Sequence, residues 1–128
     1  MSFAKVHSAQ TSVLDASIVD VEVDLSGGLH TFSIVGLPDK AVEEARDRVS
    51  SAIKNSGFKS PKVKNQKVVI SLAPADLKKE GPNFDLAMAL GYLLAAGDIR
   101  FNPKEKLFLG ELSLDGRVRG ITGTLPMT

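Results

Sequence analysis

Apolar and acidic residues alternate in the segment from Ser17 to Leu25, where positions 19, 21, 23 and 25 are apolar and positions 20, 22 and 24 are acidic. This period of two predicts a strand with one face in solvent. A second strand is expected from Leu29 to Pro38, and the intervening Ser26–Gly28 is predicted to be the turn of a hairpin. The segment from Ala4 to Gln10 is expected to pair beside them as another strand.

The next segment has the period of a helix. Asp39 is a plausible N-cap, and a helix is predicted from Asp39 to about Ser56, ended by Asn55 and Gly57. Its apolar positions fall on one face, which a core would cover. They are Val42, Ala45, Val49, Ala52 and Ile53.

Three further elements are expected downstream. Lys67 to Pro74 is a short apolar run rich in β-branched residues and predicts a buried strand. Phe84 to Ala96 is apolar nearly all round, which predicts a helix packed on several sides and closed by Gly97. Lys106 to Ile121 predicts strand, Asp115–Gly116 turn and strand. This order favours an α+β fold, with two helices packed on a mainly antiparallel sheet.

Composition narrows the class of protein. The chain has 128 residues, 43% hydrophobic and 24% charged, as expected for a single globular domain spanning residues 1–128. A net charge of +1 creates no overall field toward nucleic acid or a membrane, so such binding would need a local patch. Without cysteine there is no disulfide or thiolate chemistry. The chain shows neither a signal peptide nor a membrane-spanning run, and we expect a cytoplasmic protein that does not contact membranes.

Three stretches together carry a family resemblance. They are VGLPDKAVEEARDRVSSAIKNSG (Val35–Gly57), ISLAPADLKKEGPNFDLAMAL (Ile70–Leu90) and LGELSLDGRVRGITG (Leu109–Gly123). In order and spacing they resemble the N-terminal domain of the magnesium-chelatase-like AAA+ proteins of the competence-protein ComM family. That domain is in turn similar to the proteolytic domain of Lon and the C-terminal domain of RadA. The resemblance implies a ribosomal-protein-S5-domain-2-like fold.

In Lon-type peptidases, the turn that matches Glu80-Gly81-Pro82 presents a nucleophilic serine, and a lysine after the next hairpin is the base. Here Asn83 occupies the serine position, and the stretch matching the lysine, Thr122–Leu125, contains none. The residue types independently indicate that this domain lacks nucleophilic catalysis. Nucleophilic catalysis needs a hydroxyl or thiol beside a base, and no Ser, Thr or Cys occurs between Leu72 and Leu112. We therefore expect no catalytic residue in this domain; an active Lon-type peptidase is the alternative.

The resemblance also implies what lies outside these residues. An AAA+ ATPase module with ATP and Mg²⁺ is expected beyond Thr128, making the chain a fragment of a longer, hexameric DNA motor of the helicase or branch-migration type, acting in recombination or natural transformation. The chain itself contains no phosphate-binding P-loop, so no cofactor is expected within it.

A lysine-rich segment is the candidate DNA contact. Its members are Lys59, Lys62, Lys64 and Lys67, followed by Lys78 and Lys79 on the far side of the predicted strand. Lysines can neutralise backbone phosphates without reading sequence, although such a segment is also typical of a solvated loop. The remaining alternative is a purely structural oligomerisation module, in which these lysines would be irrelevant to DNA affinity.

The other charged residues have simpler explanations. Glu44 and Arg48 are expected to form an exposed i,i+4 ion pair on the first helix, whose charged face could also be a subunit contact. Asp85 is expected in the first turn of the second helix, where a carboxylate favours the helix dipole. His7 and His30 are predicted to lie on separate strands, and no metal site is expected.

Overall fold

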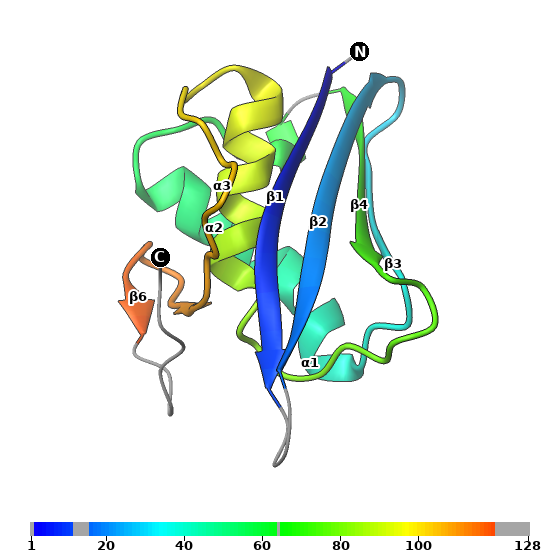
Figure 1. The fold of residues 1–128 in the computed structure, drawn as a ribbon. Helices are drawn as coiled ribbons and strands as arrows, with labels where there is room; N and C mark the ends of the chain where they lie inside the picture. The colour runs from blue at the N-terminus through cyan, green and yellow to red at the C-terminus, as the bar shows by residue number, and fades with distance from the viewer. Residues whose placement is uncertain (1, 12–15, 64, 120–128) are drawn as a thin grey trace.

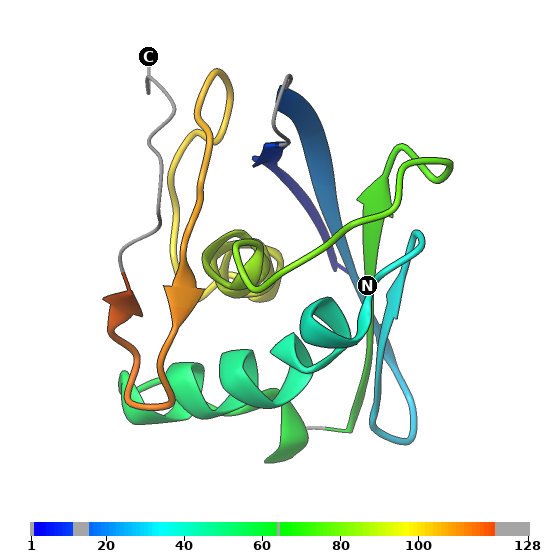
Figure 2. The same cartoon turned by 90° about the horizontal axis from the view of Figure 1, so that it is seen from below.

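The computed structural model describes residues 2–11, 16–63 and 65–119 and has an α+β fold. Four strands form one sheet in the order β1-β2-β4-β3, and the helices lie on one of its faces (Figures 1 and 2). The strands are β1 (Ser2–Thr11), β2 (Ala16–Gly27), β3 (Thr31–Val35) and β4 (Gln66–Ala73).

The alternation along β2 is confirmed. Val19, Val21 and Val23 are buried on the helix-covered face, while the acidic residues between them lie on the opposite face. β1 pairs antiparallel with β2 along its whole length, as expected for a neighbouring strand. On the face without helices, Lys5 lies opposite Glu22 and His7 lies opposite Asp20.

The predicted hairpin at Ser26–Gly28 is wrong. β4 lies between β2 and β3 and pairs antiparallel with β2 but parallel with β3, so the sheet is mixed. The run from Val68 to Leu72 is the most apolar strand segment, and a position between two neighbours buries it better than a sheet edge would. The helices that follow β3 supply the crossover that a parallel pair requires.

The first predicted helix is interrupted. It consists of α1 (Lys40–Glu43) and α2 (Ala45–Asn55), separated at Glu44. Asp39 caps α1 as predicted, because its Oδ1 accepts a hydrogen bond of 2.8 Å from the Val42 N–H. The predicted apolar face is also confirmed. Its buried members are Val42, Ala45, Val49, Ala52 and Ile53.

The second predicted helix is confirmed as α3 (Asp85–Ala96), which ends at Gly97 in the left-handed conformation. α3 packs on β1 and β2, on α2, and on the short hairpin of β5 (Glu111–Leu112) and β6 (Val118–Arg119). Gly91 allows the close approach to the sheet, since a Cβ there would lie 2.9 Å from Val23 Cγ2. Figure 2 shows α3 between the sheet and the hairpin, with α2 crossing below α3 in this view.

Candidate functional site

The predicted turn from Glu80 to Asn83 lies between β4 and α3, and β1 holds its first half. The Gln10 side chain donates from Nε2 to the Lys78 carbonyl at 2.8 Å and accepts at Oε1 from the Glu80 N–H at 2.7 Å. Both ends of this amide are therefore used to fix the backbone of the turn. Gly81 has a φ of 81°, a conformation that favours glycine.

Asp39 connects the same turn to the start of α1. Besides capping the helix, its carboxylate accepts a hydrogen bond of 3.2 Å at Oδ2 from the Gly81 N–H. The Asp39 N–H donates to the Lys79 carbonyl at 2.9 Å, and the Lys79 N–H donates to the Leu37 carbonyl at 2.9 Å. One carboxylate and a short backbone ladder thus position the turn against the β3–α1 connection.

The hairpin side of the molecule holds the second half of the turn. The Asn83 carbonyl accepts a hydrogen bond of 3.0 Å from the Gly110 N–H, and the Gly110 carbonyl accepts one of 3.1 Å from Leu86 N–H. The Gly-Pro turn and the Gly-Glu stretch, which both belong to the motifs that carry the family resemblance, are therefore neighbours in space. Asn83 is held at the N-terminal end of α3.

A buried ion pair lies directly behind this turn. Arg48 of α2 donates from Nε to Asp85 Oδ2 at 2.6 Å and from one terminal nitrogen to Asp85 Oδ1 at 3.0 Å. The Leu112 N–H donates to Asp85 Oδ2 at 3.1 Å, so the carboxylate joins α2, α3 and β5. Burial raises the pKa of Asp85, while the hydrogen bonds from Arg48 and Leu112 act in the opposite direction. The hydrogen bond to Asp85 raises the pKa of Arg48.

The expected Glu44–Arg48 ion pair is present, but it is longer and more exposed than the pair between Arg48 and Asp85. Its charged atoms are 3.7 Å apart, and the Glu44 side chain is 56% exposed. The prediction that Arg48 belongs to an exposed salt-bridged face is wrong, because its guanidinium turns inward to Asp85, which is 0% exposed. Asp85 does lie in the first turn of α3, as predicted, but it is a buried ion-pair partner as well as a dipole-favouring carboxylate.

A polar cavity of about 390 Å³ opens beside the turn. Gln10, Asp39, Glu80, Gly81 and Asn83 contribute to its lining. None of the described residues that line it carries a hydroxyl, thiol or ammonium group. An amide at position 83 can donate and accept hydrogen bonds but cannot act as a nucleophile.

Comparison with known proteins identifies the family. A sequence profile of the family described as "Subunit ChlI of Mg-chelatase" matches residues 21–128. The chain belongs to this family. It is 44% identical over 127 residues to "Competence protein ComM" of Haemophilus influenzae, which covers 98% of the chain and 24% of that relative. It is also 44% identical over 126 residues to "Uncharacterized protein YifB" of Escherichia coli, again 98% of the chain and 24% of the relative.

A mycobacterial relative matches over the same extent. "Uncharacterized protein Rv2897c" of Mycobacterium tuberculosis is 41% identical over 127 residues, which is 98% of the chain and 25% of the relative. The chain therefore spans about a quarter of the length of these curated relatives. The resemblance to the ComM family that the sequence motifs indicated is confirmed.

The candidate lysines of this ChlI-family chain do not form one surface. Lys59, Lys62 and Lys67 are exposed and lie before or at the first residues of β4, whereas the exposed Lys78 follows its far end. Six strand residues follow Lys67, so the far end of β4 lies roughly 20 Å from it. Lys62 forms an exposed ion pair of 3.2 Å with Asp47. Lys64 lies outside the described residues.

Lys79 is not a surface residue. It is 0% exposed, and its ammonium group donates to the Pro74 carbonyl. Burial lowers the pKa of Lys79, and Asp76 opposes that effect. The prediction that Lys79 contacts DNA is wrong in this fold, because its side chain is buried and its ammonium group is bonded to a backbone carbonyl.

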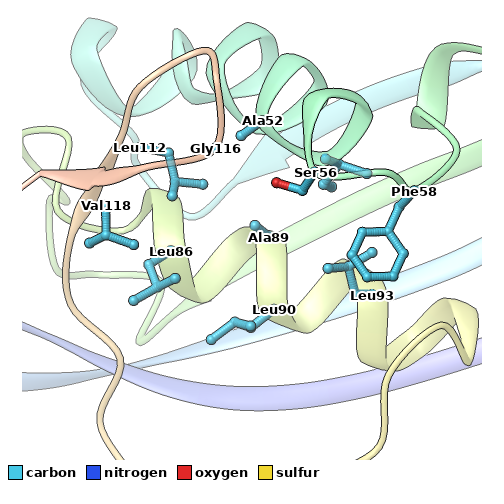
Figure 3. A pocket seen from close by; sticks show the side chains of 11 residues that line it. Ala52, Ser56, Phe58, Leu86, Ala89, Leu90, Leu93, Leu112, Gly116 and Val118 are labelled. Carbon is cyan, nitrogen blue, oxygen red and sulfur yellow. The ribbon is translucent and has the colours of Figure 1, made fainter.

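A second, apolar cavity of about 150 Å³ lies between α2, α3 and the β5–β6 hairpin. Figure 3 shows Leu86, Ala89, Leu90 and Leu93 of α3 along it, at helical spacing, with Val118 on the hairpin side. Asn55 Nδ2 donates to the Leu114 carbonyl at 2.7 Å and fixes the hairpin at one end of this cavity. The nearly all-round apolar character of α3 is thus explained by contacts on opposite sides.

The histidines have structural partners. His7 Nδ1 lies 2.7 Å from Asp20 Oδ1, and His30 Nδ1 lies 3.0 Å from the Gln66 carbonyl. His30 precedes β3 rather than lying in a strand, which corrects its predicted position. No group of three or more potential metal-binding side chains occurs among residues 2–11, 16–63 and 65–119. Within the same residues, no helix has the length and apolar character needed to span a bilayer.

Proposed function

We propose that this chain is the non-proteolytic N-terminal domain of a ComM-type AAA+ ATPase that acts on DNA. The observation that supports the proposal most directly is the 44% identity to ComM over 98% of the chain. The motor module, with ATP and Mg²⁺, is placed beyond Thr128, and the assembled protein is a hexameric ring that drives helicase or branch-migration chemistry. In this proposal the domain contributes ring assembly, DNA contact or both.

The proposed fold type is that of the S5-domain-2 and Lon peptidase domains, in which the turn ending at Asn83 would present the nucleophile. An amide at this position, with no hydroxyl or thiol in the described cavity lining, supports a domain without peptidase chemistry. The variant Asn83→Ser tests this proposal. We expect it to leave casein intact, because the chain has no lysine after Lys106 to act as the base. Cleavage by the purified variant would contradict the proposal.

DNA contact is tested by fluorescence anisotropy with labelled single-stranded and forked DNA at low and physiological salt. The exposed Lys59, Lys62 and Lys67 are replaced by Glu in one variant. If each contacts a phosphate, the slope of log affinity against log salt for single-stranded DNA becomes shallower by about 2. A matched control with the same change in net charge replaces other exposed lysines: Lys40, Lys104 and Lys106.

Equal loss of DNA binding in both variants would indicate net charge alone rather than a local contact. If the folded wild-type chain does not bind DNA even at low salt, the domain contributes ring assembly rather than DNA contact. The AAA+ part of the proposal has its own check, which is the reading frame beyond Thr128. A P-loop should follow there, and a stop codon directly after Thr128 would refute the assignment.

A further inference from the structure

The polar cavity beside the turn has no role in the proposed function, yet its framework is built from distant parts of the chain. Gln10 comes from the end of β1, Asp39 from the start of α1, and Glu80 and Asn83 from the segment before α3. Its volume of about 390 Å³ is within the range of small-ligand sites. The remaining hydrogen-bonding groups of the lining indicate what kind of ligand would fit.

Three of the donors around the cavity already have partners inside the protein. The Gln10 amide donates to the Lys78 carbonyl, and the Glu80 N–H donates to Gln10. The Gly81 N–H donates to Asp39. An anionic ligand, such as a phosphate or a carboxylate, would also meet the two carboxylates of Asp39 and Glu80.

The unused groups are mainly acceptors. The Glu80 carboxylate is exposed and forms no ion pair with another described residue, and the Asn83 side-chain amide has no hydrogen-bond partner among them. Asp39 adds a second negative charge, and no lysine, arginine or histidine contributes to the described lining. Among the described side chains of the lining, the free groups are thus one carboxylate and one amide.

We propose that this cavity binds an organic cation, an ammonium or guanidinium group, presented by a basic residue of a peptide or protein partner. The cation lies between the Glu80 carboxylate and Asn83 Oδ1, where charge-assisted hydrogen bonds form. The Asn83 Nδ2 donates to a backbone carbonyl of the partner. A free polyamine shares the cationic chemistry but has no carbonyl for Asn83, so the two sources can be separated.

The test follows backbone amide shifts of the ¹⁵N-labelled chain in titrations with small probes. Nα-acetyl-arginine methylamide supplies the cation and the carbonyl, whereas putrescine supplies only the cation. Nα-acetyl-citrulline methylamide keeps the shape and carbonyl of the arginine probe without its charge. We expect the arginine probe to shift the amides of Gly81 and Asn83 and the citrulline probe to bind more weakly.

Two exposed substitutions make the assignment specific. Glu80→Gln should weaken binding of the arginine probe by roughly two- to fivefold, since a partly solvated ion pair contributes modestly. Asp24→Asn makes the same charge change on the opposite face of the sheet and should have no effect. Asn83→Ala should weaken binding of the arginine probe more than binding of putrescine, because the arginine probe loses its contacts to both Oδ1 and Nδ2 whereas putrescine loses only the contact to Oδ1.

Arginine-probe binding that depends on Glu80 and Asn83 supports the proposal. If putrescine binds more tightly than the arginine probe and Asn83→Ala does not change its affinity, the ligand is not a basic residue of a peptide. If the citrulline probe binds as tightly as the arginine probe, the site does not recognise charge. Absence of shifts at Gly81 and Asn83 at any probe concentration would overturn the site itself. DNA binding and ring assembly are read out by other assays, so these outcomes do not depend on the proposed function.

Discussion

Replacing Arg48 with Met removes the cation that pairs with Asp85 while keeping an unbranched apolar side chain of similar length. In the wild type, the guanidinium approaches the carboxylate at 2.6 and 3.0 Å, and Asp85 is 0% exposed. The variant leaves a buried carboxylate with the Leu112 N–H as its remaining described donor. The perturbation therefore tests whether this pair holds α2, α3 and β5 together.

The expected cost is set by the charge that remains. Removing one partner of a buried pair typically destabilises by about 3–5 kcal/mol. Arg48 is itself 18% exposed at its side chain, so solvent reaches the site and the lower end, about 3 kcal/mol, is expected. This is a large fraction of the total free energy of unfolding of a domain, which is about 5–15 kcal/mol.

The assay is urea unfolding followed by circular dichroism on a double-mutant cycle. Asp85→Asn keeps an acceptor for the Leu112 N–H, and the double variant with Arg48→Met leaves neither charge buried. The double variant should therefore lose less stability than the sum of the two single variants, by about 1–3 kcal/mol. Glu44→Gln is the control, because its pair at 3.7 Å is exposed and should contribute at most about 0.5 kcal/mol. Additive single effects, or a cost below about 1 kcal/mol for Arg48→Met, would refute the reasoning.

The same variant has a defined pH dependence. Loss of Arg48 removes a hydrogen bond and a charge that lower the pKa of Asp85, so burial raises this pKa further in the variant. An acid whose pKa is higher in the folded state binds more protons there, and stability falls as pH rises from the unfolded pKa through the folded one. The deficit of Arg48→Met relative to wild type should therefore be smaller near pH 4, about the unfolded pKa of Asp, than at pH 7. A deficit that grows as the pH falls would contradict the assignment.

Two pairs of substitutions test the local packing. Gly36→Ala should destabilise by about 3 kcal/mol or more, because φ is 106° and a Cβ would lie 2.1 Å from the Leu72 carbonyl oxygen. Gly27→Ala, with no atom within 4 Å of its Cβ position, should change stability by less than about 1 kcal/mol. Ala89→Leu extends into the apolar cavity of Figure 3 and should stabilise by about 0.5–1 kcal/mol, whereas Ala87→Leu, at a fully buried position, should destabilise by about 1–3 kcal/mol. Urea unfolding measures the stability of all four variants. If Gly36→Ala and Gly27→Ala have similar effects, or if Ala89→Leu and Ala87→Leu do, the space around each residue does not decide the result.

Local patterns in the sequence predicted most elements and their buried faces. The alternation along β2, the apolar stripe of α2 and the end of α3 at Gly97 all depend on residues close together in the chain. Such patterns report which side of an element is apolar, and that side is the one that folding covers. They also explain why the break at Glu44 was missed, since the apolar face continues across it.

Strand order was decided by the tertiary structure. Adjacent strands in the sequence predicted a hairpin, but β4 pairs with both β2 and β3. The choice between these arrangements depends on which strand gains most from two neighbours and on a helical crossover that packs on the sheet. Both factors, the burial gained by the central strand and the packing of the crossover, depend on residues far apart in the sequence, so a window of ten residues does not show them.

The candidate site divides in the same way. The turn and the absence of a nucleophile at Asn83 follow from the sequence alone, because they depend on side-chain chemistry at consecutive positions. The partners that position the turn do not: Gln10 bonds across 68 and 70 positions, and Arg48 finds Asp85 across 37. The burial of Lys79 beside the exposed Lys78 belongs to the same class. Chain composition determines which groups can pair, whereas only the folded backbone decides which of them are brought within hydrogen-bond distance and out of water.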